Sequence, residues 1–472
     1  MFRSRPLLIA AGLYFLTVAA WACTVAAFGP SSTKDGRPIL WKNRDVNDPA
    51  QEFQYFDRGG FRFVANTYAG ETTHVWAGIN EAGFAIMNSD AHNIGGFDRP
   101  GDDGLLMFNA LNGCATVADF EVLLDSSNEV GREWTANYGV FDSTGLTAMF
   151  EAANTWYVRY DASEDPYGMI VRANYAFSGD SNRMSGLERY HRAFGLCTTA
   201  YRNNEIDAEW VFDVLARDLA LPDLDPYPLP FEGRYQGYAY GCFPTNQALN
   251  RKRTVSVEVM VGNRPGEPAL TGMMWALAGG PEVGLPVPLW VCAESVPVAL
   301  DGETTSELSD SAQSLRRYTY PYEELPDLVN TFAVHEVERT FGSVESTIFA
   351  MTGSAEELRA GRVPTKDEAF ALSEEACRLA LNAYTRFGQP PVRPDTARKL
   401  PTIVGDVLRL RMPAGVGRCD VFDATGRKKA TLSSPPGALL RWEARDLVDG
   451  SYLVKFPDAP DETPVRFIRI SR

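Results

Sequence analysis

The sequence predicts a layered α+β fold followed by a small β-sandwich, and three features of the chain lead to this prediction. Between Cys23 and about Ala173, short apolar runs alternate with turn signals, as in a meander of β-strands. Segments with helical spacing do not alternate with the strands one by one, which favours packed layers over a parallel βαβ sheet. A stiff, proline-rich break at Gly388–Pro394 then precedes a last group of evenly spaced short strands.

The strands follow from short apolar or β-branched runs bounded by turn residues. The first two, Thr24–Phe28 and Pro38–Trp41, are joined through Lys34-Asp35-Gly36, which is a turn signal. The remaining strands expected in the large domain are Phe61–Tyr68, His74–Ile79, Phe84–Asn88, Tyr138–Phe141, Leu146–Glu151, Trp156–Tyr160, Met169–Ala173, Thr254–Val261, Met273–Leu277 and Val287–Val291.

Helices are expected where apolar residues recur at a period near 3.6. Thr365–Phe387 has this pattern behind a capping box formed by Thr365 and Glu368. The other expected helices are Leu105–Leu111, Val117–Leu124, Ser185–Leu196 and Ala208–Leu219.

The chain is expected to divide into four parts. Residues 1–22 are predicted to be a signal peptide, residues 23–390 the large domain, residues 391–400 a linker and residues 401–472 the β-sandwich. The sandwich strands are expected at Ile403–Arg411, Arg418–Phe422, Ala438–Trp442, Ser451–Phe456 and Val465–Ile470. Parts of this domain resemble the sorting domains that end some secreted bacterial proteins, and an accessory domain without a sorting role is the alternative.

Composition limits the possible partners. The chain has 472 residues, of which 45% are hydrophobic and 22% charged, as in a folded protein. Its formal charge of −16 disfavours nucleic acid and anionic lipid as partners. No long apolar run follows the signal peptide, so no stable membrane insertion is expected after its removal.

Cysteines and histidines give no metal or hydrolase pattern apart from Cys23. The seven cysteines are scattered without a C-x-x-C motif, and buried free thiols are the state expected for most of them. The four histidines form no zinc-binding or Ser-His-Asp pattern, and no metal or cofactor is expected.

Cys23 is the residue that predicts chemistry. Arg3 and Arg5 precede an apolar segment, and Ala20-Trp21-Ala22 is an A-x-A cleavage site. Cleavage after Ala22 gives Cys23 a free α-amine, so that one residue carries both a thiol and a base. The α-amine titrates near ~7.7–8.0 and the thiol near ~8.5, which makes proton transfer between them nearly balanced. The alternative is that Cys23 is lipidated, although Ala20 and Trp21 fit that signal poorly.

Residues 22–45 resemble the start of N-terminal-nucleophile hydrolases that use cysteine. The closest likeness is to the group of choloylglycine hydrolases, penicillin V acylases, cysteine dipeptidases and isopenicillin-N acyltransferases. The motifs that carry the resemblance are Cys23-Thr24, Asp35-Gly36, Lys42-Asn43, Asp45, Gly78–Gly83 with Met87-Asn88, Val171–Tyr175 and Gly186–Tyr190.

The resemblance implies a four-layer αββα sandwich and an enzyme that hydrolyses a linear amide through a thioester on Cys23. It further implies that Asp45 holds the α-ammonium and that Asn174, with Asn88 or a backbone amide, donates to the oxyanion. Arg189 matches an arginine of the family's site. Lys42 stands where many choloylglycine hydrolases have arginine, and Lys42 with Arg44 is expected to bind substrate.

Two other functions stay open at this stage. The chain could be an acyltransferase of the isopenicillin-N type, or a lipid-anchored surface protein that binds without turnover. In the hydrolase reading the partner is a small-molecule amide, and the protein is secreted, periplasmic or on the surface of a bacterial cell. The identity of the amide and the oligomeric state do not follow from the sequence.

Overall fold

The computed structural model describes residues 23–95, 103–302, 304–359, 363–387, 402–404, 407–412, 415–423, 427–436, 438–443, 447, 450–457, 459 and 465–469. The predicted signal peptide (1–22) and linker (391–400) lie outside these residues, and both stay predictions. The chain forms two compact units. The first unit contains the residues up to Asp225 together with Thr245–Arg317 and Phe341–Leu381. The second unit contains Pro226–Pro244, Tyr318–Thr340 and the residues from Asn382 onward.

Two antiparallel sheets form the centre of the first unit. The six-stranded sheet has the order β10-β1-β2-β12-β13-β14, and the seven-stranded sheet is the meander β3-β4-β5-β6-β7-β8-β9. The strands of the six-stranded sheet are β1 Thr24–Phe28, β2 Ile39–Asp45, β10 Met169–Arg172, β12 Thr254–Val261, β13 Met273–Ala278 and β14 Val287–Trp290. Those of the seven-stranded sheet are β3 Gln51–Phe56, β4 Phe63–Tyr68, β5 Ala77–Asn80, β6 Ala85–Asp90, β7 Ala136–Phe141, β8 Thr147–Ala152 and β9 Tyr157–Asp161.

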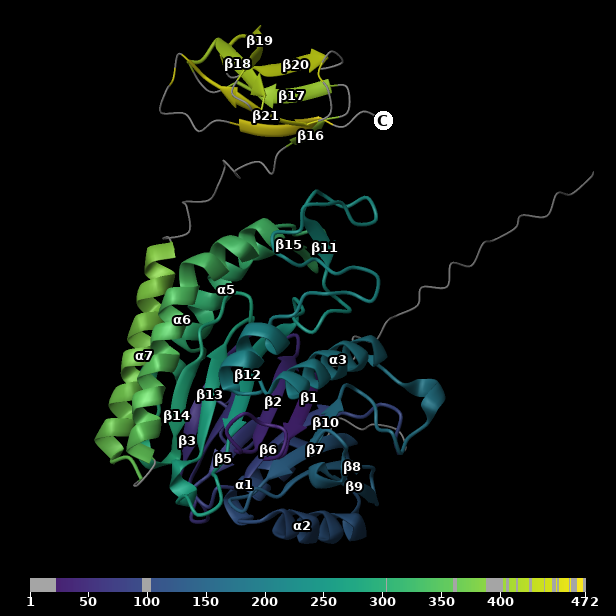
Figure 1. Ribbon diagram of the computed structural model, residues 1–472, viewed down its shortest axis with the longest axis vertical. Coiled ribbons are helices and arrows are strands. Elements are labelled where there is room, and N and C mark those ends of the chain that lie inside the picture. Colours follow the sequence, from purple (N-terminus) through teal and green to yellow (C-terminus); the bar gives the residue numbers. More distant parts are fainter. Residues whose placement is uncertain are drawn as a thin grey trace, which may run out of the picture. The chain divides into compact units, whose positions relative to one another are not determined.

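The two sheets lie face to face. Strands β1 and β2 pack against β6 and β7, and strands β12 and β13 pack against β5. Since both faces of nearly every strand are covered, β1, β2 and β12 are buried along their whole length. Figure 1 shows these two layers with helices on either side.

Helices cover the outer face of each sheet. Helices α1 (Asp103–Gly113) and α2 (Val117–Val130) bury Met107 and Phe120 in a core with the seven-stranded sheet. Helix α3 (Leu187–Asn203) and the π-helix η3 (Val211–Ala216) lie on the six-stranded sheet. There Trp275 of β13 contacts Phe349 of α6, with ring centroids 4.8 Å apart. The predicted α+β class and its four αββα layers are therefore confirmed.

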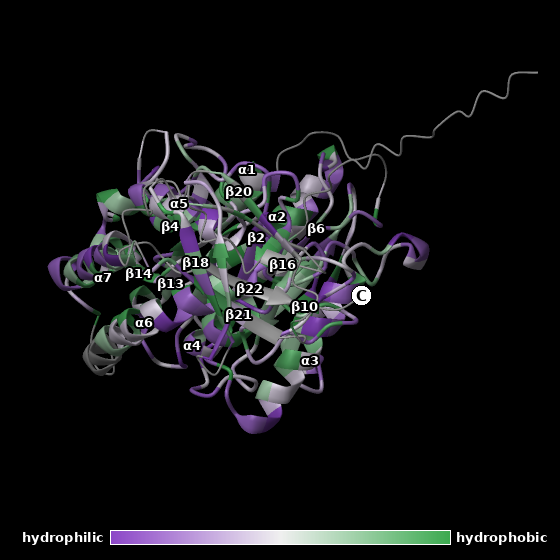
Figure 2. Ribbon diagram, turned by 90° about the horizontal axis from the view of Figure 1, so that it is seen from above, coloured by the Kyte–Doolittle hydropathy of each residue, from purple (hydrophilic) through white to green (hydrophobic). Residues whose placement is uncertain are grey.

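The remaining helices are α4 (Ala208–Trp210), α5 (Glu307–Thr319), α6 (Thr331–Arg359) and α7 (Lys366–Phe387). In the hydropathy colours of Figure 2, α6 and α7 each carry both hydrophilic and hydrophobic residues, as expected for helices that cover a sheet. No helix of the described residues is long and apolar enough to cross a membrane.

The second unit contains the C-terminal strands. A five-stranded sheet, β16-β22-β21-β18-β19, accompanies a two-stranded sheet, β17-β20. Leu410 and Leu440 of the small sheet share one core with Val421 and Val454 of the large one, which makes the predicted sandwich. The strands are β16 Thr402–Val404, β17 Val407–Arg411, β18 Arg418–Asp423, β19 Lys428–Ser433, β20 Leu439–Glu443, β21 Gly450–Lys455 and β22 Val465–Arg469, with β11 Cys242–Pro244 and β15 Leu328–Asn330 forming a separate pair.

Some predicted elements differ from the structure. The strand expected at Ile403–Arg411 is two strands in different sheets, because β16 pairs with β22 and β17 with β20. The helix expected at Ala208–Leu219 begins as α4 and continues as the π-helix η3. Strands β3 and β19 and helices α5 and α6 were not expected.

Phe120 tests the core under α2. Its ring is fully buried and contacts Phe84, Tyr138 and Phe150. Phe120→Ala is expected to lower the unfolding free energy by about 3–5 kcal/mol, because it removes buried apolar contacts and leaves a cavity. Val122 on the same helix is 64% exposed, so Val122→Ala is the matched control. It should change the unfolding free energy by less than about 0.5 kcal/mol. Equal effects of the two substitutions in denaturant titrations would contradict this packing.

Candidate active site

Cys23 lies directly before β1, the strand that pairs with both β2 and β10 in the six-stranded sheet. The turn that returns the chain from β1 to β2 contains Gly36 at φ +76°, where glycine is free of strain, and the Arg37 N–H donates to Asp35 Oδ1. Antiparallel pairing sets Thr24 opposite Asn43, which brings Cys23 beside the end of β2. Cys23 is 6% exposed.

Alternate residues of β2 serve the two faces of the sheet. Lys42 and Arg44 face the seven-stranded sheet: Lys42 Nζ donates to the carbonyl of Trp76, and Arg44 lies over the Trp76 ring. Asn43 faces the helices and donates to the carbonyl of Ala216 at the end of η3. Strand β2 therefore places the cations Lys42 and Arg44 between the two sheets and a hydrogen-bonding side chain, Asn43, against the helical layer.

Arg189 ties the nucleophile to two other elements. From α3, its Nη1 donates to the Cys23 carbonyl and to Thr24 Oγ1, each at 2.7 Å. Its Nη2 donates to Asn174 Oδ1, also at 2.7 Å. Since a guanidinium only donates, this bond fixes the Asn174 amide with its Nδ2 turned away, where it donates to the Asp90 carbonyl at 3.3 Å.

Gly186 leaves the space that Arg189 needs. It is the N-cap of α3 at φ +77°, and a Cβ there would lie 2.1 Å from Arg189 Nη2. The glycine of the Gly186–Tyr190 motif is thus required both by backbone conformation and by close approach.

Asp45 lies in a second polar group at the end of β2. It accepts from Thr254 Oγ1 at 2.6 Å and from Arg251 Nη1 at 3.1 Å. Burial raises the pKa of Asp45, while Arg251 and Arg189 oppose that rise. Arg251 is a site residue that the sequence motifs did not indicate, because it lies in an irregular segment before β12.

Lys42 and Asn88 form a third group with Asp103. Lys42 Nζ donates to Asn88 Oδ1 at 2.5 Å, and Asn88 Nδ2 donates to Asp103 Oδ2 at 2.6 Å. Both hydrogen bonds identified for Asn88 therefore lead to Lys42 and Asp103. Burial lowers the pKa of Lys42, and burial with the charge of Asp90 raises the pKa of Asp103 to about 7.

These groups act electrostatically on Cys23. Burial raises the pKa of its thiol, Lys42 and Arg44 lower it, and Asp45 and Asp90 raise it. In the full chain the nitrogen of Cys23 is an amide, and only cleavage after Ala22 makes it a base. The structure thus brings the predicted residues into one neighbourhood: Cys23, Asn174 and Arg189 directly, and Lys42, Arg44, Asp45 and Asn88 around them.

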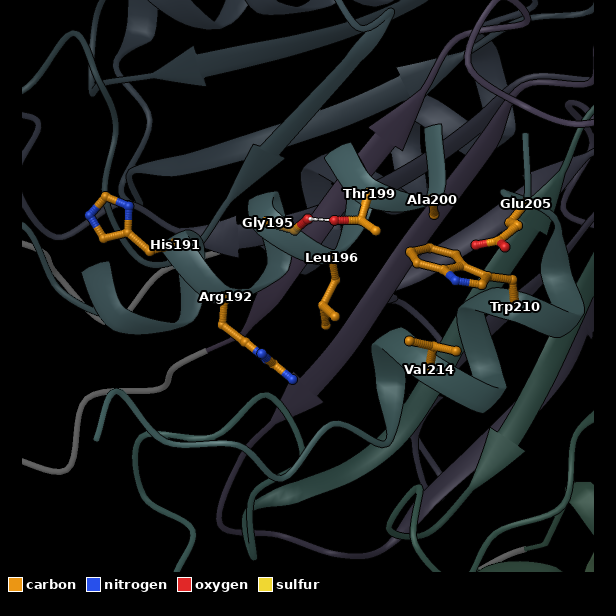
Figure 3. A pocket seen from close by; sticks show the side chains of 9 residues that line it. All are labelled: His191, Arg192, Gly195, Leu196, Thr199, Ala200, Glu205, Trp210 and Val214. Carbon is orange, nitrogen blue, oxygen red and sulfur yellow. Dashed lines mark hydrogen bonds between the residues drawn. The ribbon is translucent and has the colours of Figure 1, made fainter. Parts of the chain in front are cut away.

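No group of three or more His, Cys, Asp or Glu side chains that could hold a metal ion occurs in the described part of the chain. Cys23, Cys114, Cys197, Cys242, Cys377 and Cys419 are buried free thiols, and Cys292 is half-buried. A cavity of about 540 Å³ lies between α3 and the α4–η3 segment, where Leu196, Trp210 and Val214 line it (Figure 3). Cys23 does not line this cavity.

No family model matches the chain, and no curated protein matches its sequence. Among solved structures, the chain is similar to a conjugated bile acid hydrolase from Clostridium perfringens, with 12% identity over 54% of this chain and 89% of that one, at a TM-score of 0.36. It is similar to an N-acylethanolamine-hydrolyzing acid amidase ortholog from Caenorhabditis elegans, with 15% identity over 52% and 94% of the two chains and a TM-score of 0.35. A penicillin V acylase from Agrobacterium tumefaciens gives 15% identity, 60% and 89% coverage and a TM-score of 0.35.

These solved structures include a penicillin V acylase, which belongs to one of the enzyme groups that the sequence motifs resemble. At these identities and TM-scores the similarity does not establish a reaction. The reaction has to follow from the chemistry of the side chains around Cys23.

The raised pKa of Asp103 predicts a pH-dependent stability. The folded pKa of about 7 exceeds the unfolded value near ~3.9, so the folded state binds more protons between these values, and Asp103 makes the fold less stable as the pH rises through this window. Asp103→Asn removes this ionisation, and its Oδ1 can still accept from Asn88. Measured against the wild type by denaturant unfolding, the variant should gain relative stability from pH 5 to pH 8.

Asp119→Asn is the control for that experiment. The hydroxyl of Thr116 and the adjoining backbone lower the pKa of Asp119, so this group is ionised in both states above pH 5. Its stability difference from the wild type should stay constant from pH 5 to pH 8. A pH-independent difference for Asp103→Asn as well would contradict the raised pKa.

Proposed function

We propose that the mature protein is an N-terminal-cysteine amidohydrolase that cleaves a linear amide through a thioester intermediate. The observation that carries this proposal is the position of Cys23: it follows an A-x-A sequence and lies buried at the start of a central strand, with two cationic side chains of β2 facing the same space. A structural or lipidated cysteine does not need this surrounding charge.

In the first step the α-amine of Cys23 takes the proton of its own thiol, because the ordinary pKa values of an α-amine and a thiol lie close together and the charges of Lys42 and Arg44 oppose the rise that burial causes in the pKa of the thiol. The thiolate then attacks the carbonyl carbon of the amide, and the π electrons move onto the carbonyl oxygen. Lys42 supports this step because its charge is the largest charge effect that lowers the pKa of the thiol.

Asn174 supplies a donor for the oxyanion. Arg189 fixes its amide, and only one of its two Nδ2 hydrogens is needed for the bond to the Asp90 carbonyl. The second hydrogen is free to bind the negative oxygen, a type of contact worth about 10²–10³ in rate. Asn88 Nδ2 likewise uses one hydrogen, for Asp103 Oδ2, so Asn88 stays the second candidate donor.

The intermediate then collapses. The C–N bond breaks, the α-ammonium returns its proton to the leaving amine, and the acyl group remains on Cys23 as a thioester. Water, deprotonated by the same α-amine, attacks the thioester and releases the acid and the thiol. The charge of Asp45, balanced by Arg251, stabilises the ammonium form between these transfers.

Hydrolysis is proposed over acyl transfer because water is the default acceptor, and no described feature selects another nucleophile. Export through the predicted signal peptide is part of the proposal, since cleavage of that segment creates the α-amine. No cofactor takes part in these steps.

Processing and chemistry can be tested together. A protein that retains Ala22 before an unchanged Cys23 should be inactive, because its α-amine is an amide and cannot accept a proton. Cys23→Ala in the mature protein should be inactive too, and Cys23→Ser should keep the fold but lose most turnover, since a hydroxyl ionises far less readily than a thiol. The assay is release of amine from a panel of N-acyl amides, with circular dichroism as the control for folding.

Equal rates for the mature and the Ala22-extended protein would rule out an N-terminal nucleophile. Acyl mass on Cys23 in the protein isolated from its host would support the lipid-anchored alternative instead, because the lipid blocks the amine.

Lys42 predicts a shift in the pH profile. Lys42→Met removes the charge that lowers the pKa of the Cys23 thiol, so the acidic limb of kcat/KM should move to higher pH. Activity at pH 7 should fall at least about tenfold, the effect of one unit in the pKa of a thiol, and should partly recover at pH 9. Lys42→Arg keeps the charge and serves as the matched control. A loss that is equal at every pH would assign Lys42 a purely structural role.

A further inference from the structure

Buried polar atoms without a partner gather between the two sheets beside Cys23. In the part of the chain that the structure describes, no hydrogen bond is made by Nη2 of Arg44, Nε1 of Trp76, Oγ of Ser256 or either carboxyl oxygen of Glu258. Protein interiors leave few such atoms unpaired, and each normally marks a bound molecule or a functional role. Their concentration here, next to the proposed nucleophile, indicates a binding site.

The sheet register places these groups on one face. Thr24 pairs with Asn43, so Cys23 lies beside Arg44, and Arg44 in turn pairs with Ser256 of β12. Glu258 is two residues further along β12, and alternation turns it to the same face as Ser256. The next strand, β13, places the small side chains of Ala276 and Ala278 opposite Glu258 and Ser256.

Arg44 is held as a rigid donor. Its Nε donates to Gln51 Oε1 at 2.9 Å, and its guanidinium carbon lies 4.8 Å and 4.3 Å from the ring centroids of Tyr68 and Trp76. Two aromatic rings and one amide thus fix the plane of the guanidinium, while Nη2 stays unpaired. A planar fork of this kind suits a carboxylate.

Glu258 offers the opposite charge. Its side chain is fully buried, and its cross-strand neighbour Lys42 directs Nζ to Trp76 and Asn88 and forms no ion pair with it. Burial raises the pKa of Glu258, while the charge of Lys42 and the Ser256 hydroxyl, which lies outside hydrogen-bond geometry, oppose that rise. A buried carboxyl group without a donor is costly, and a ligand ammonium removes that cost.

We propose that Arg44 and Glu258 bind a zwitterionic amino-acid head group of the substrate, with its α-carboxylate on Arg44 and its α-ammonium on Glu258. This inference rests on the proposed amidohydrolase function and names the class of amide. A zwitterion adds no net charge to the buried space, whereas a lone anion or cation would leave Glu258 or Arg44 unmatched.

The distance between Glu258 and Cys23 determines how many bonds must separate the α-ammonium of the substrate from its scissile carbonyl carbon. Glu258 is on β12, two strands away from Cys23, which is roughly 10 Å across the sheet. In a dipeptide the α-ammonium is only two bonds from the scissile carbonyl carbon. While that carbon lies at Cys23, the α-ammonium therefore cannot reach Glu258. An amide formed through the amino-acid side chain puts more bonds between the α-ammonium and the scissile carbonyl carbon: about four in a γ-glutamyl amide and about seven in an Nε-acyl-lysine.

Matched substrates test this on the unaltered mature protein. For γ-glutamyl-4-nitroanilide the analogues are the glutaryl amide, which lacks the amine, and the 4-aminobutyryl amide, which lacks the carboxylate. For Nε-acetyl-lysine they are 6-acetamidohexanoate and N-acetylcadaverine. In at least one series the intact head group should raise kcat/KM by about 10- to 100-fold over both analogues, the effect of a hydrogen bond to a charged group.

Variants then assign each charge. Glu258→Gln should reduce cleavage of the intact substrate more than that of the analogue without the amine. Arg44→Gln should reduce cleavage of the intact substrate more than that of the analogue without the carboxylate, beyond the loss on all substrates that follows from its effect on the pKa of the Cys23 thiol. Glu209→Gln, an exposed acid on α4, is the matched control and should change neither. An equal loss on all substrates would overturn the inference and make Glu258 a counter-ion of Lys42.

Binding gives a readout that does not depend on turnover. The mature Cys23→Ala protein should bind free L-glutamate or L-lysine in calorimetry, and Glu258→Gln should weaken that binding. Absence of binding, or equal cleavage of substrates with and without the head group, would overturn the subsite. Turnover that survives in the Ala22-extended protein would instead refute the proposed function and leave the binding result standing.

Discussion

The guanidinium of Arg189 is the contact on which the arrangement of the site depends. It joins the carbonyl of Cys23 and the hydroxyl of Thr24 to the amide of Asn174, which is 150 residues further along the chain. Burial lowers the pKa of Arg189 to about 10, so it stays a cation at physiological pH. Without these bonds, neither the start of β1 nor the Asn174 amide would have a fixed direction.

Charge is distributed unevenly between the two faces of β2. On the helical face Asp45 is matched by Arg251 and Thr254, so its partners are complete. On the inner face Lys42 is satisfied through Trp76 and Asn88, while Glu258 is not. Buried charges are tolerated when they are paired or serve a ligand, and this contrast separates the polar group that is paired within the protein from the one assigned to substrate.

The sequence was sufficient for the elements with strong local signals. Strands β1 and β12 and helix α7 agree with the prediction to within a residue, because each has an uninterrupted apolar pattern with a clear turn or cap. Helix α6 was missed although Val334, Val337, Phe341 and Ile348 recur at helical spacing and are buried, since an interior glycine and many threonines weaken the signal.

Only the site residues that belong to sequence motifs could be predicted. Cys23, Asp45, Asn174 and Arg189 were found through the resemblance. Arg251, Asp103 and Glu258 depend on strand pairing and on side chains that meet from distant segments, and no local pattern marks them. The sequence alone also does not reveal that Asn88 Nδ2 donates to Asp103.

The turn at Lys34-Asp35-Gly36 has a consequence for how this protein can change over evolution. Surface turns usually accept insertions and deletions, and Lys34 is largely exposed. Here, however, a slip of β2 by one residue against β1 would turn Lys42 and Arg44 toward the helices and bring Asn43 and Asp45 inside. Substitutions of Lys34 should therefore be common among descendants of the sequence, whereas changes in the length of the turn should be rare, even though it lies at the far end of the hairpin from Cys23.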